Sequence, residues 1–342
     1  MKTIIIAEAG VNHNGCLETA IEMVNQASYS KADFIKFQYF NASELVIPTE
    51  TKANYQKKNT DNNETQYEML KRLELRESDF IKLSKHCAQK NIRFLCSPFS
   101  ISSADFLYSI NSSFVKISSG NITDRPLLET ISKKNWNIIF SIGMSSITEI
   151  DDAFKILSKS GKSKKKLSIL LCTSQYPTPF NDVHLRAMKS LRERYGVKVG
   201  LSDHTVGIHI PIAAVALGAT LIEKHFTLDK NMSGPDHKAS IDSEQLKNMV
   251  SQIRDVEKSL GISDIGPRKS EKENLPKARK SIVALNEIKI GDIFSSKNLT
   301  TMRPGYGISP MKIYELIGLI AKKTYKKNDL IDISELEGHS NE

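Results

Sequence analysis

The sequence predicts an α/β fold, a (β/α)8 or TIM barrel followed by a small β-rich domain. Eight short, β-rich apolar runs alternate with stretches of helical spacing over the first two thirds of the chain, as in such a barrel. Beyond Leu260 the composition changes to a charged stretch with two prolines, which is typical of a linker. A doubly wound open sheet is the alternative, but no G-x-G-x-x-G opens a helix after the first run.

The barrel elements alternate along the chain, with one irregular region between the second and third strands. The predicted strands are Thr3–Ala7, Asp33–Phe37, Ile92–Cys96, Phe114–Ile117, Asn137–Ser141, Leu167–Cys172, Val197–Leu201 and Ala219–Glu223. Helical spacing is found in Leu17–Ser28, Ser78–Lys90, Ser146–Ser160, Asp182–Arg194, Gly207–Leu217 and Asp242–Leu260. The polar stretch Asn41–Thr65 has no clear period, and long loops inside a compact domain tend to be functional lids.

The domain boundaries follow from these patterns. We expect a barrel domain over residues 1–262, a linker over 263–278 and a small β-rich domain over 279–342. The last is too small to hold a large core and is expected to pack on something else.

The composition is that of a globular protein outside the membrane and the secretory route. The apolar runs have the length of strands and are too short to span a bilayer. The start MKTIIIAEAG is typical of a first strand rather than of a signal peptide. Four scattered cysteines without a C-x-x-C pair indicate a reducing compartment, so we expect the protein to be cytoplasmic.

A net charge of +9 is compatible with a protein that binds nucleic acid. The densest basic clusters, Lys162–Lys166 and Arg268–Lys280, contain no interleaved aromatic residues, so we expect no nucleic-acid partner. An anionic small-molecule substrate drawn to a basic site explains the surplus equally well.

Charged and hydroxyl side chains follow several of the predicted strands, at the end of the barrel where active sites lie. Lys36 and Lys116 lie inside the apolar runs FIKFQ and FVKIS. A buried ammonium costs several kcal/mol unless it meets an anion, so we expect both lysines to bind one. The serines that follow strands, Ser97, Ser119 and Ser202, either cap the next helix or bind a ligand.

Two histidines, His204 and His225, end neighbouring predicted strands, so their rings can come within reach of one metal ion. Oxygen-bearing groups nearby favour Mn²⁺ or Mg²⁺ over a closed zinc site. Glu8 ends the first strand, and Ser174 and Tyr176 follow the sixth. Asp236 lies in the turn Ser233–His237, which is either a plain loop or an acidic contact at the barrel mouth. These patterns predict a metal-dependent enzyme for an anionic substrate without naming its reaction.

Longer motifs resemble the bacterial sialic acid synthase family over nearly the whole chain. The barrel motifs are AEAGVNHNG, ADFIKFQ, SPFS, VKISSGN, SIGMSS, CTSQYPTPFNDVHLRAM, VGLSDHTVGIH and IEKHFTLDKNMSGPDHKAS. The tail segments ARKSIVALNEIKIGDIFS and TTMRPGYGISP resemble the antifreeze-like (SAF) domain, a β-clip fold, that ends these enzymes.

The resemblance implies a condensation of phosphoenolpyruvate with an N-acetylated amino sugar to a nine-carbon keto acid and phosphate, with C–O cleavage. The first prediction is an N-acetylneuraminate synthase that uses N-acetylmannosamine. The alternative is an N,N'-diacetyllegionaminate synthase that uses 2,4-diacetamido-2,4,6-trideoxymannose. A barrel that binds a sugar or an anion without catalysis is the hypothesis from another class. The product would serve a surface glycan such as capsule, lipopolysaccharide or flagellin.

The resemblance also implies a role for each candidate residue. Mn²⁺, or Mg²⁺ or Co²⁺, is held by the residues matching His204 and His225. Phosphoenolpyruvate is held by those matching Lys36, Ser97, Lys116, Ser119 and Ser202, and Glu8 handles the attacking water. Ser174, Tyr176 and Asp236 match sugar contacts. Arg303 matches a sugar contact that one subunit's tail supplies to its partner's barrel in a domain-swapped homodimer.

The chain departs from the family at two places near the site. Ser119-Gly120-Asn121 replaces the common Ser-Gly-Glu and removes a carboxylate near the expected anion site. Ser174 stands two residues before Tyr176, in a segment that more often carries Asn, Thr or Glu before the tyrosine.

Overall fold

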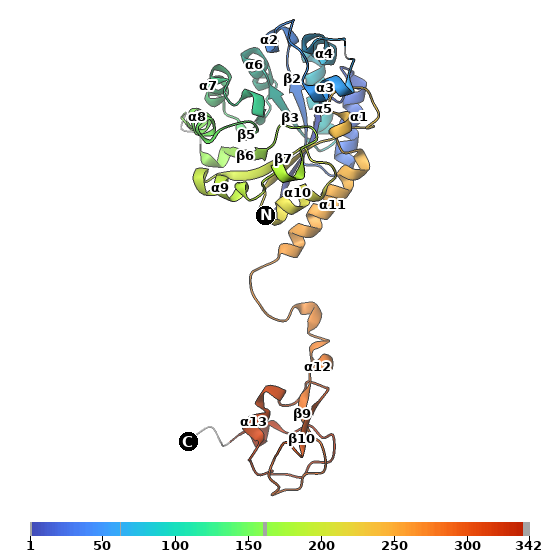
Figure 1. Cartoon of the computed structure of the whole chain (residues 1–342), viewed down its shortest axis with the longest axis vertical. Helices are drawn as coiled ribbons and strands as arrows, with labels where there is room; N and C mark the ends of the chain where they lie inside the picture. Colours follow the sequence, from blue (N-terminus) through green and yellow to red (C-terminus); the bar gives the residue numbers. More distant parts are fainter. Residues whose placement is uncertain (1, 62, 160–162, 338–342) are drawn as a thin grey trace. The chain divides into compact units, whose positions relative to one another are not determined.

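The computed structural model describes residues 2–61, 63–159 and 163–337. The chain divides into two compact units, Met1–Gly261 and Ile262–Glu342, and each is described by itself (Figure 1). The predicted helix end at Ser160, Lys162 of the first basic cluster and the last residues of the predicted tail domain lie outside the described residues.

Eight strands and eleven α-helices make up the described part of the first unit. The strands are β1 (Ile4–Gly10), β2 (Phe34–Tyr39), β3 (Arg93–Pro98), β4 (Phe114–Ile117), β5 (Asn137–Ser141), β6 (Leu167–Cys172), β7 (Lys198–Asp203) and β8 (Leu221–His225). The helices are α1 (Leu17–Tyr29), α2 (Ala42–Leu45), α3 (Asn54–Asn59), α4 (Gln66–Leu73), α5 (Glu77–Gln89), α6 (Ile101–Ser109), α7 (Arg125–Lys133), α8 (Ile147–Ser158), α9 (Ala187–Tyr195), α10 (His209–Ala216) and α11 (Ser243–Leu260).

The eight strands form one parallel sheet that curls into a barrel. Hydrogen bonding runs in the order β3-β2-β1-β8-β7-β6-β5-β4, and the two outer strands, β3 and β4, lie beside each other and close the sheet. Gly200 of β7 permits a close approach to β8, because a Cβ there would lie 2.1 Å from the backbone oxygen of Leu221. The predicted barrel is therefore confirmed.

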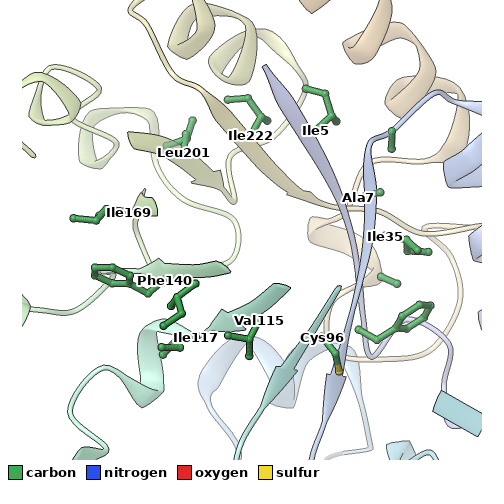
Figure 2. Close-up of a cluster of buried hydrophobic side chains, with 14 of the residues drawn as sticks. Ile5, Ala7, Ile35, Cys96, Val115, Ile117, Phe140, Ile169, Leu201 and Ile222 are labelled. Atoms are coloured by element: carbon green, nitrogen blue, oxygen red, sulfur yellow. The ribbon is translucent and has the colours of Figure 1, made fainter. Parts of the chain in front are cut away.

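Alternation along the strands separates an outer layer from the barrel interior. The outward-facing residues, such as Ile5, Ala7, Ile35 and Ile222, pack against the helices in the main core (Figure 2). The interior begins with a separate apolar layer of Ile6, Phe34, Leu95, Ile139, Leu170 and Leu221. Two residues further along the same strands stand Glu8, Lys36, Ser97, Ser141, Cys172 and Glu223. The period of two thus places a polar layer directly above the apolar one.

Several strands run further than the sequence predicts. β1 continues to Gly10, β2 to Tyr39, β7 to Asp203 and β8 to His225. Apolar patterning ends a predicted strand at its first polar side chain, whereas backbone pairing continues into the polar layer of the barrel. His225 is therefore the last residue of β8, and its backbone pairs with that of Glu8.

Two helical expectations were wrong. The polar stretch Asn41–Thr65 is not one irregular loop, because it contains the short helices α2 and α3. The predicted helix Asp182–Arg194 begins later, at Ala187, after a 3-10 turn over Phe180–Asp182. The helices α2 and α3 have only one or two turns, which are too short to produce an apolar stripe in the sequence. Before α9, the left-handed backbone of His184 (φ 50°) prevents the helix from starting earlier.

The second unit is a small β-rich domain with a core of its own. It contains β9 (Ser281–Ala284), β10 (Leu299–Met302), α12 (Leu275–Ala278) and α13 (Ile313–Leu316), and β9 and β10 pair antiparallel. Isolated bridges such as Ile288 with Tyr325 extend the strand-like pairing around Phe294 and Leu316, which are buried. In the described ranges, no helix of either unit has the length and apolarity that crossing a bilayer requires.

Candidate active site

A cavity of about 520 Å³ opens at the carboxyl ends of the barrel strands. Predicted site residues from six strands or the loops after them line it: Glu8, Lys36, Lys116, Ser119, Ser174, Tyr176, Ser202, His204, His225 and Asp236. Further lining comes from the stretch between β2 and α5, through Tyr55, Gln56, Gln66, Met69, Leu70 and Leu73. The polar layer of the barrel is therefore the floor of this cavity.

Glu223 connects the two buried lysines. Its carboxylate lies 3.6 Å from Nζ of Lys36 and 3.5 Å from Nζ of Lys116, and Oε1 accepts a hydrogen bond from Ser202 Oγ at 2.9 Å. Lys36 also pairs with Glu8 at 3.0 Å. The register explains this proximity, because Lys36 and Glu8 are paired across β1 and β2, and Ser202 and Glu223 across β7 and β8.

Burial opposes the charge on both lysines, with different outcomes. Two carboxylates, Glu223 and Glu8, face Lys36 and raise its pKa in spite of burial. For Lys116 burial dominates over the attraction of Glu223, and its pKa is lowered. Burial would raise the pKa of Glu223, but the two lysines and the Ser202 hydroxyl hold it below its usual value. The four charges therefore form one mutually dependent group.

Glu8 keeps one carboxylate oxygen without a partner. Its Oε1 accepts hydrogen bonds from Gln38 Nε2 at 2.9 Å and pairs with Lys36. Its Oε2 is buried and has no hydrogen-bond partner in the part of the chain that the structure describes. Burial raises the pKa of Glu8 despite the opposing charge of Lys36. A buried carboxylate with a free oxygen and a raised pKa is suited to exchanging a proton with a ligand.

The two histidine rings lie close together, with centroids 5.4 Å apart. His204 Nδ1 donates to the carbonyl oxygen of Thr173 at 2.8 Å, which leaves Nε2 with a free lone pair. His225 Nδ1 is buried and has no hydrogen-bond partner among the described residues. Residues 2–61, 63–159 and 163–337 contain no cluster of three or more His, Cys, Asp or Glu side chains with metal-binding geometry. Two neighbouring imidazoles of this kind could serve as ligands of one divalent ion.

Aromatic and acidic groups complete the side of the cavity next to the histidines. The ring of Tyr176 lies 4.1 Å from that of His204, and Tyr55 of α3 stacks on Tyr176 at 5.0 Å. Asp236 is buried, and burial together with the charge of Glu8 raises its pKa to about 6. A Cβ on Gly143 would lie 2.3 Å from Ser174 Oγ, so a larger residue there would force that hydroxyl to move. The backbone N–H of Gly143 also donates to Ser119 Oγ at 2.9 Å.

Two predicted site residues, Ser97 and Arg303, are not among those that line the cavity. Ser97 is fully buried and does not line the cavity, although it accepts a hydrogen bond from Lys36 Nζ at 3.4 Å. Arg303 belongs to the second unit, where its Nε donates to the carbonyl oxygen of Ala278 at 3.0 Å. Asn121, at the departure from the family pattern, accepts from Ser118 Oγ at 2.5 Å and does not line the cavity.

Sequence reasoning assigned no role to Glu223 or Tyr55. Glu223 carries the same signal as the two lysines, a charged residue inside the apolar run LIEKH. Tyr55 carries no such signal, because it lies in a polar stretch and reaches the cavity only through the placement of α3.

The buried lysines and the two neighbouring imidazoles at the mouth of this barrel are typical of an enzyme that acts on an anionic substrate. The chain belongs to the NeuB family, whose profile matches residues 23–264, and the SAF domain matches residues 279–337. Members of this family are synthases that condense phosphoenolpyruvate with a sugar, and the protein is an enzyme of this kind.

Two relatives share the name N,N'-diacetyllegionaminic acid synthase. The protein of Campylobacter jejuni is 49% identical over 96% of this chain and 99% of its own length. That of Legionella pneumophila is 44% identical over 93% of this chain and 90% of its own. Among solved structures, the N-acetylneuraminic acid synthetase of Leptospira borgpetersenii is 33% identical, with a TM-score of 0.70 over 80% of this chain and 90% of its own.

Proposed function

We propose that this protein is an N,N'-diacetyllegionaminic acid synthase that condenses phosphoenolpyruvate with 2,4-diacetamido-2,4,6-trideoxymannose. The observation that carries the proposal is the higher identity to the two synthases of that name than to the N-acetylneuraminic acid synthetase. The sequence alone had put N-acetylneuraminate synthase first, and the comparisons favour the alternative.

The lining of the cavity agrees with a 6-deoxy sugar. Val11 and Phe99 line it together with Met69, Leu70 and Leu73 of α4, and these five side chains belong to one apolar cluster. A methyl group at C6 can rest on such a wall, whereas the C6 hydroxyl of N-acetylmannosamine must find a hydrogen-bond partner or lose free energy.

The other substrate is assigned to the floor of the cavity. Lys36 and Lys116 would form charge-assisted hydrogen bonds to the carboxylate and phosphate of phosphoenolpyruvate. The hydroxyl of Ser119 would be a further donor, and that of Ser202 would join it by turning away from Glu223. Lys36 Nζ also donates a hydrogen bond to Ser97 Oγ at 3.4 Å. The negative charges of phosphoenolpyruvate would compensate for the free-energy cost of burying the two ammonium groups.

His204 and His225 would hold the divalent ion, Mn²⁺ or else Mg²⁺ or Co²⁺, which supplies Lewis-acid polarisation of the sugar aldehyde when bound. The donation from His204 Nδ1 to Thr173 would direct Nε2 to the ion, and His225 Nδ1 has no hydrogen-bond partner among the described residues, which fits this use. Tyr176, Ser174 and Asp236 surround the same side of the cavity and would orient the amino sugar.

The reaction joins C3 of phosphoenolpyruvate to the aldehyde carbon, water adds to C2, and the C2–O bond breaks to release phosphate. The free Oε2 of Glu8 can accept a proton from the attacking water, since its raised pKa makes the carboxylate a stronger base than usual. We further propose that the enzyme is a homodimer in which Arg303 of one subunit's tail contacts the sugar in the partner's barrel.

The test uses phosphoenolpyruvate with ¹⁸O in the bridging C2–O position, together with the diacetamido sugar and Mn²⁺. We expect mass spectrometry to show a nine-carbon keto acid of the mass of diacetyllegionaminic acid and the label in the released phosphate. Absence of that product, or label retained in the keto acid, would contradict the proposal.

A further inference from the structure

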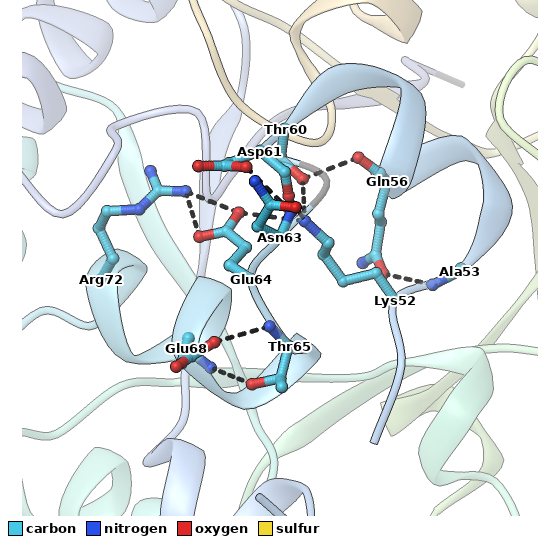
Figure 3. Close-up of polar contacts among 10 residues, drawn as sticks. All are labelled: Lys52, Ala53, Gln56, Thr60, Asp61, Asn63, Glu64, Thr65, Glu68 and Arg72. Carbon is cyan, nitrogen blue, oxygen red and sulfur yellow. Dashed lines mark hydrogen bonds and ion pairs between the residues drawn. The ribbon is translucent and has the colours of Figure 1, made fainter. Parts of the chain in front are cut away.

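A buried lysine fastens the chain segment that covers one side of the cavity. Lys52 is 3% exposed, and its Nζ donates to Thr60 Oγ1 at 2.8 Å and to the backbone oxygen of Asp61 and lies 3.3 Å from Glu64 (Figure 3). Arg72 of α4 pairs with the same glutamate at 3.1 Å. These contacts tie both ends of α3 together and to α4.

The fastened helix α3 reaches the cavity through Tyr55. The Tyr55 ring stacks on Tyr176 at 5.0 Å and 27°, and Tyr176 in turn lies on His204 at 4.1 Å and 32°. Tyr176 is thus held between two rings, one of which belongs to a proposed metal ligand. Asn59, at the other end of α3, donates to the backbone oxygen of Pro235 at 3.1 Å, next to Asp236.

We propose that Tyr55 is a positioning residue for the amino sugar and that Lys52 holds Tyr55 in place. The stack fixes the orientation of Tyr176, since offset aromatic pairs of this kind contribute about 0.5–1.5 kcal/mol beyond their buried area. The contact from Asn59 fixes the loop that carries Asp236 in the same way. This inference rests on the proposed function only in that the cavity takes an amino sugar.

The variants Tyr55→Ala and Tyr55→Phe separate the ring from its hydroxyl. We expect Tyr55→Ala to raise KM for the amino sugar five- to tenfold, with KM for phosphoenolpyruvate and the thermal midpoint little changed. Tyr55→Phe keeps the stacked ring and should restore sugar KM to within twofold of the original enzyme. Tyr67→Ala is the matched control, because Tyr67 is half-buried in the neighbouring α4 and does not line the cavity.

Lys52→Met tests the fastening, because Glu64 keeps its contact with Arg72 when the ammonium is removed. If Lys52 acts through Tyr55, Lys52→Met alone raises sugar KM, and it adds less than twofold in the Tyr55→Ala background. Independent, multiplying effects of the two substitutions would overturn the role of Lys52.

Calorimetric titration with 2,4-diacetamido-2,4,6-trideoxymannose and with N-acetylmannosamine measures sugar binding without turnover, using the full chain with Mn²⁺. We expect at least fivefold weaker binding by Tyr55→Ala and unchanged binding by Tyr67→Ala. Equal sugar affinity of Tyr55→Ala and the original enzyme would overturn the proposal. If the original enzyme binds a sugar but does not condense it with phosphoenolpyruvate, the proposed function is contradicted. The role of Tyr55 is still supported in that case if Tyr55→Ala weakens sugar binding.

Discussion

Replacing Glu223 by Gln removes the charge that holds the two buried lysines together. Glu223 is the one carboxylate within 4 Å of Lys116 Nζ in the described chain, whereas Lys36 keeps its pair with Glu8. The substitution preserves size and leaves a hydrogen-bonding group for Ser202. Lys116 then becomes a buried cation without a charged partner.

The expected cost follows from that orphaned charge. Breaking a buried ion pair by removing one partner costs about 3–5 kcal/mol. For a domain of this size each kcal/mol lowers the melting temperature by about 2–4 °C, so the barrel should melt roughly 6–20 °C lower. Lys116 can limit the loss by giving up its proton, because burial already lowers its pKa. The defect of Glu223→Gln should therefore shrink as pH rises from 7 to 9.

Thermal unfolding followed by circular dichroism measures this loss with and without inorganic phosphate. Phosphate should raise the melting temperature more in Glu223→Gln than in the original enzyme, because the variant no longer has a Glu223 carboxylate that repels the bound phosphate. Ser202→Ala is the control, since it removes one hydrogen bond to Glu223 and should cost about 1 kcal/mol. Equal melting temperatures and equal phosphate responses for Glu223→Gln and the original enzyme would refute the reasoning.

Three further predictions concern other parts of the enzyme. Replacing His204 or His225 by Ala should abolish metal-dependent phosphate release in a Mn²⁺ titration after chelation, and unchanged turnover would remove that residue as a ligand. Asp236 has a folded-state pKa of about 6 against 3.8 for the unfolded chain, so the native state binds the extra proton and loses stability as pH rises through that window. Asp236→Asn should therefore stabilise the metal-free, chelated enzyme by about 3 kcal/mol at pH 8 and by almost nothing below pH 4. Denaturant titrations at the two pH values measure the free energy of unfolding, and equal stability of the variant and the original enzyme at pH 8 would contradict the prediction. A chain ended at Gly261 should keep the barrel's circular dichroism spectrum and lose turnover, and full activity would contradict the proposed role of the tail.

The barrel could be predicted because each strand pattern is local. The apolar runs alternate with helical stretches in the sequence itself, and Phe114–Ile117 and Leu167–Cys172 have the predicted ends. The cost of burying an ammonium pointed to Lys36 and Lys116, and both line the cavity. Such features need only neighbouring residues and one general rule about burial.

Other parts of the site depend on contacts that no single stretch encodes. Tyr55 lies in a polar segment, and its ring stacks on Tyr176, a residue far from it in the sequence. The bridging position of Glu223 follows from the register of β7 and β8 and from the closeness of Lys36, which lies on a different strand. Side-chain placement of this kind is a property of the assembled barrel.

The most direct measurement of the central claim is phosphate release from phosphoenolpyruvate with each amino sugar at matched concentrations. We predict kcat/KM for 2,4-diacetamido-2,4,6-trideoxymannose to exceed that for N-acetylmannosamine by more than tenfold, equivalent to about 1.4 kcal/mol in the barrier. Equal values, or a preference for N-acetylmannosamine, would contradict the account.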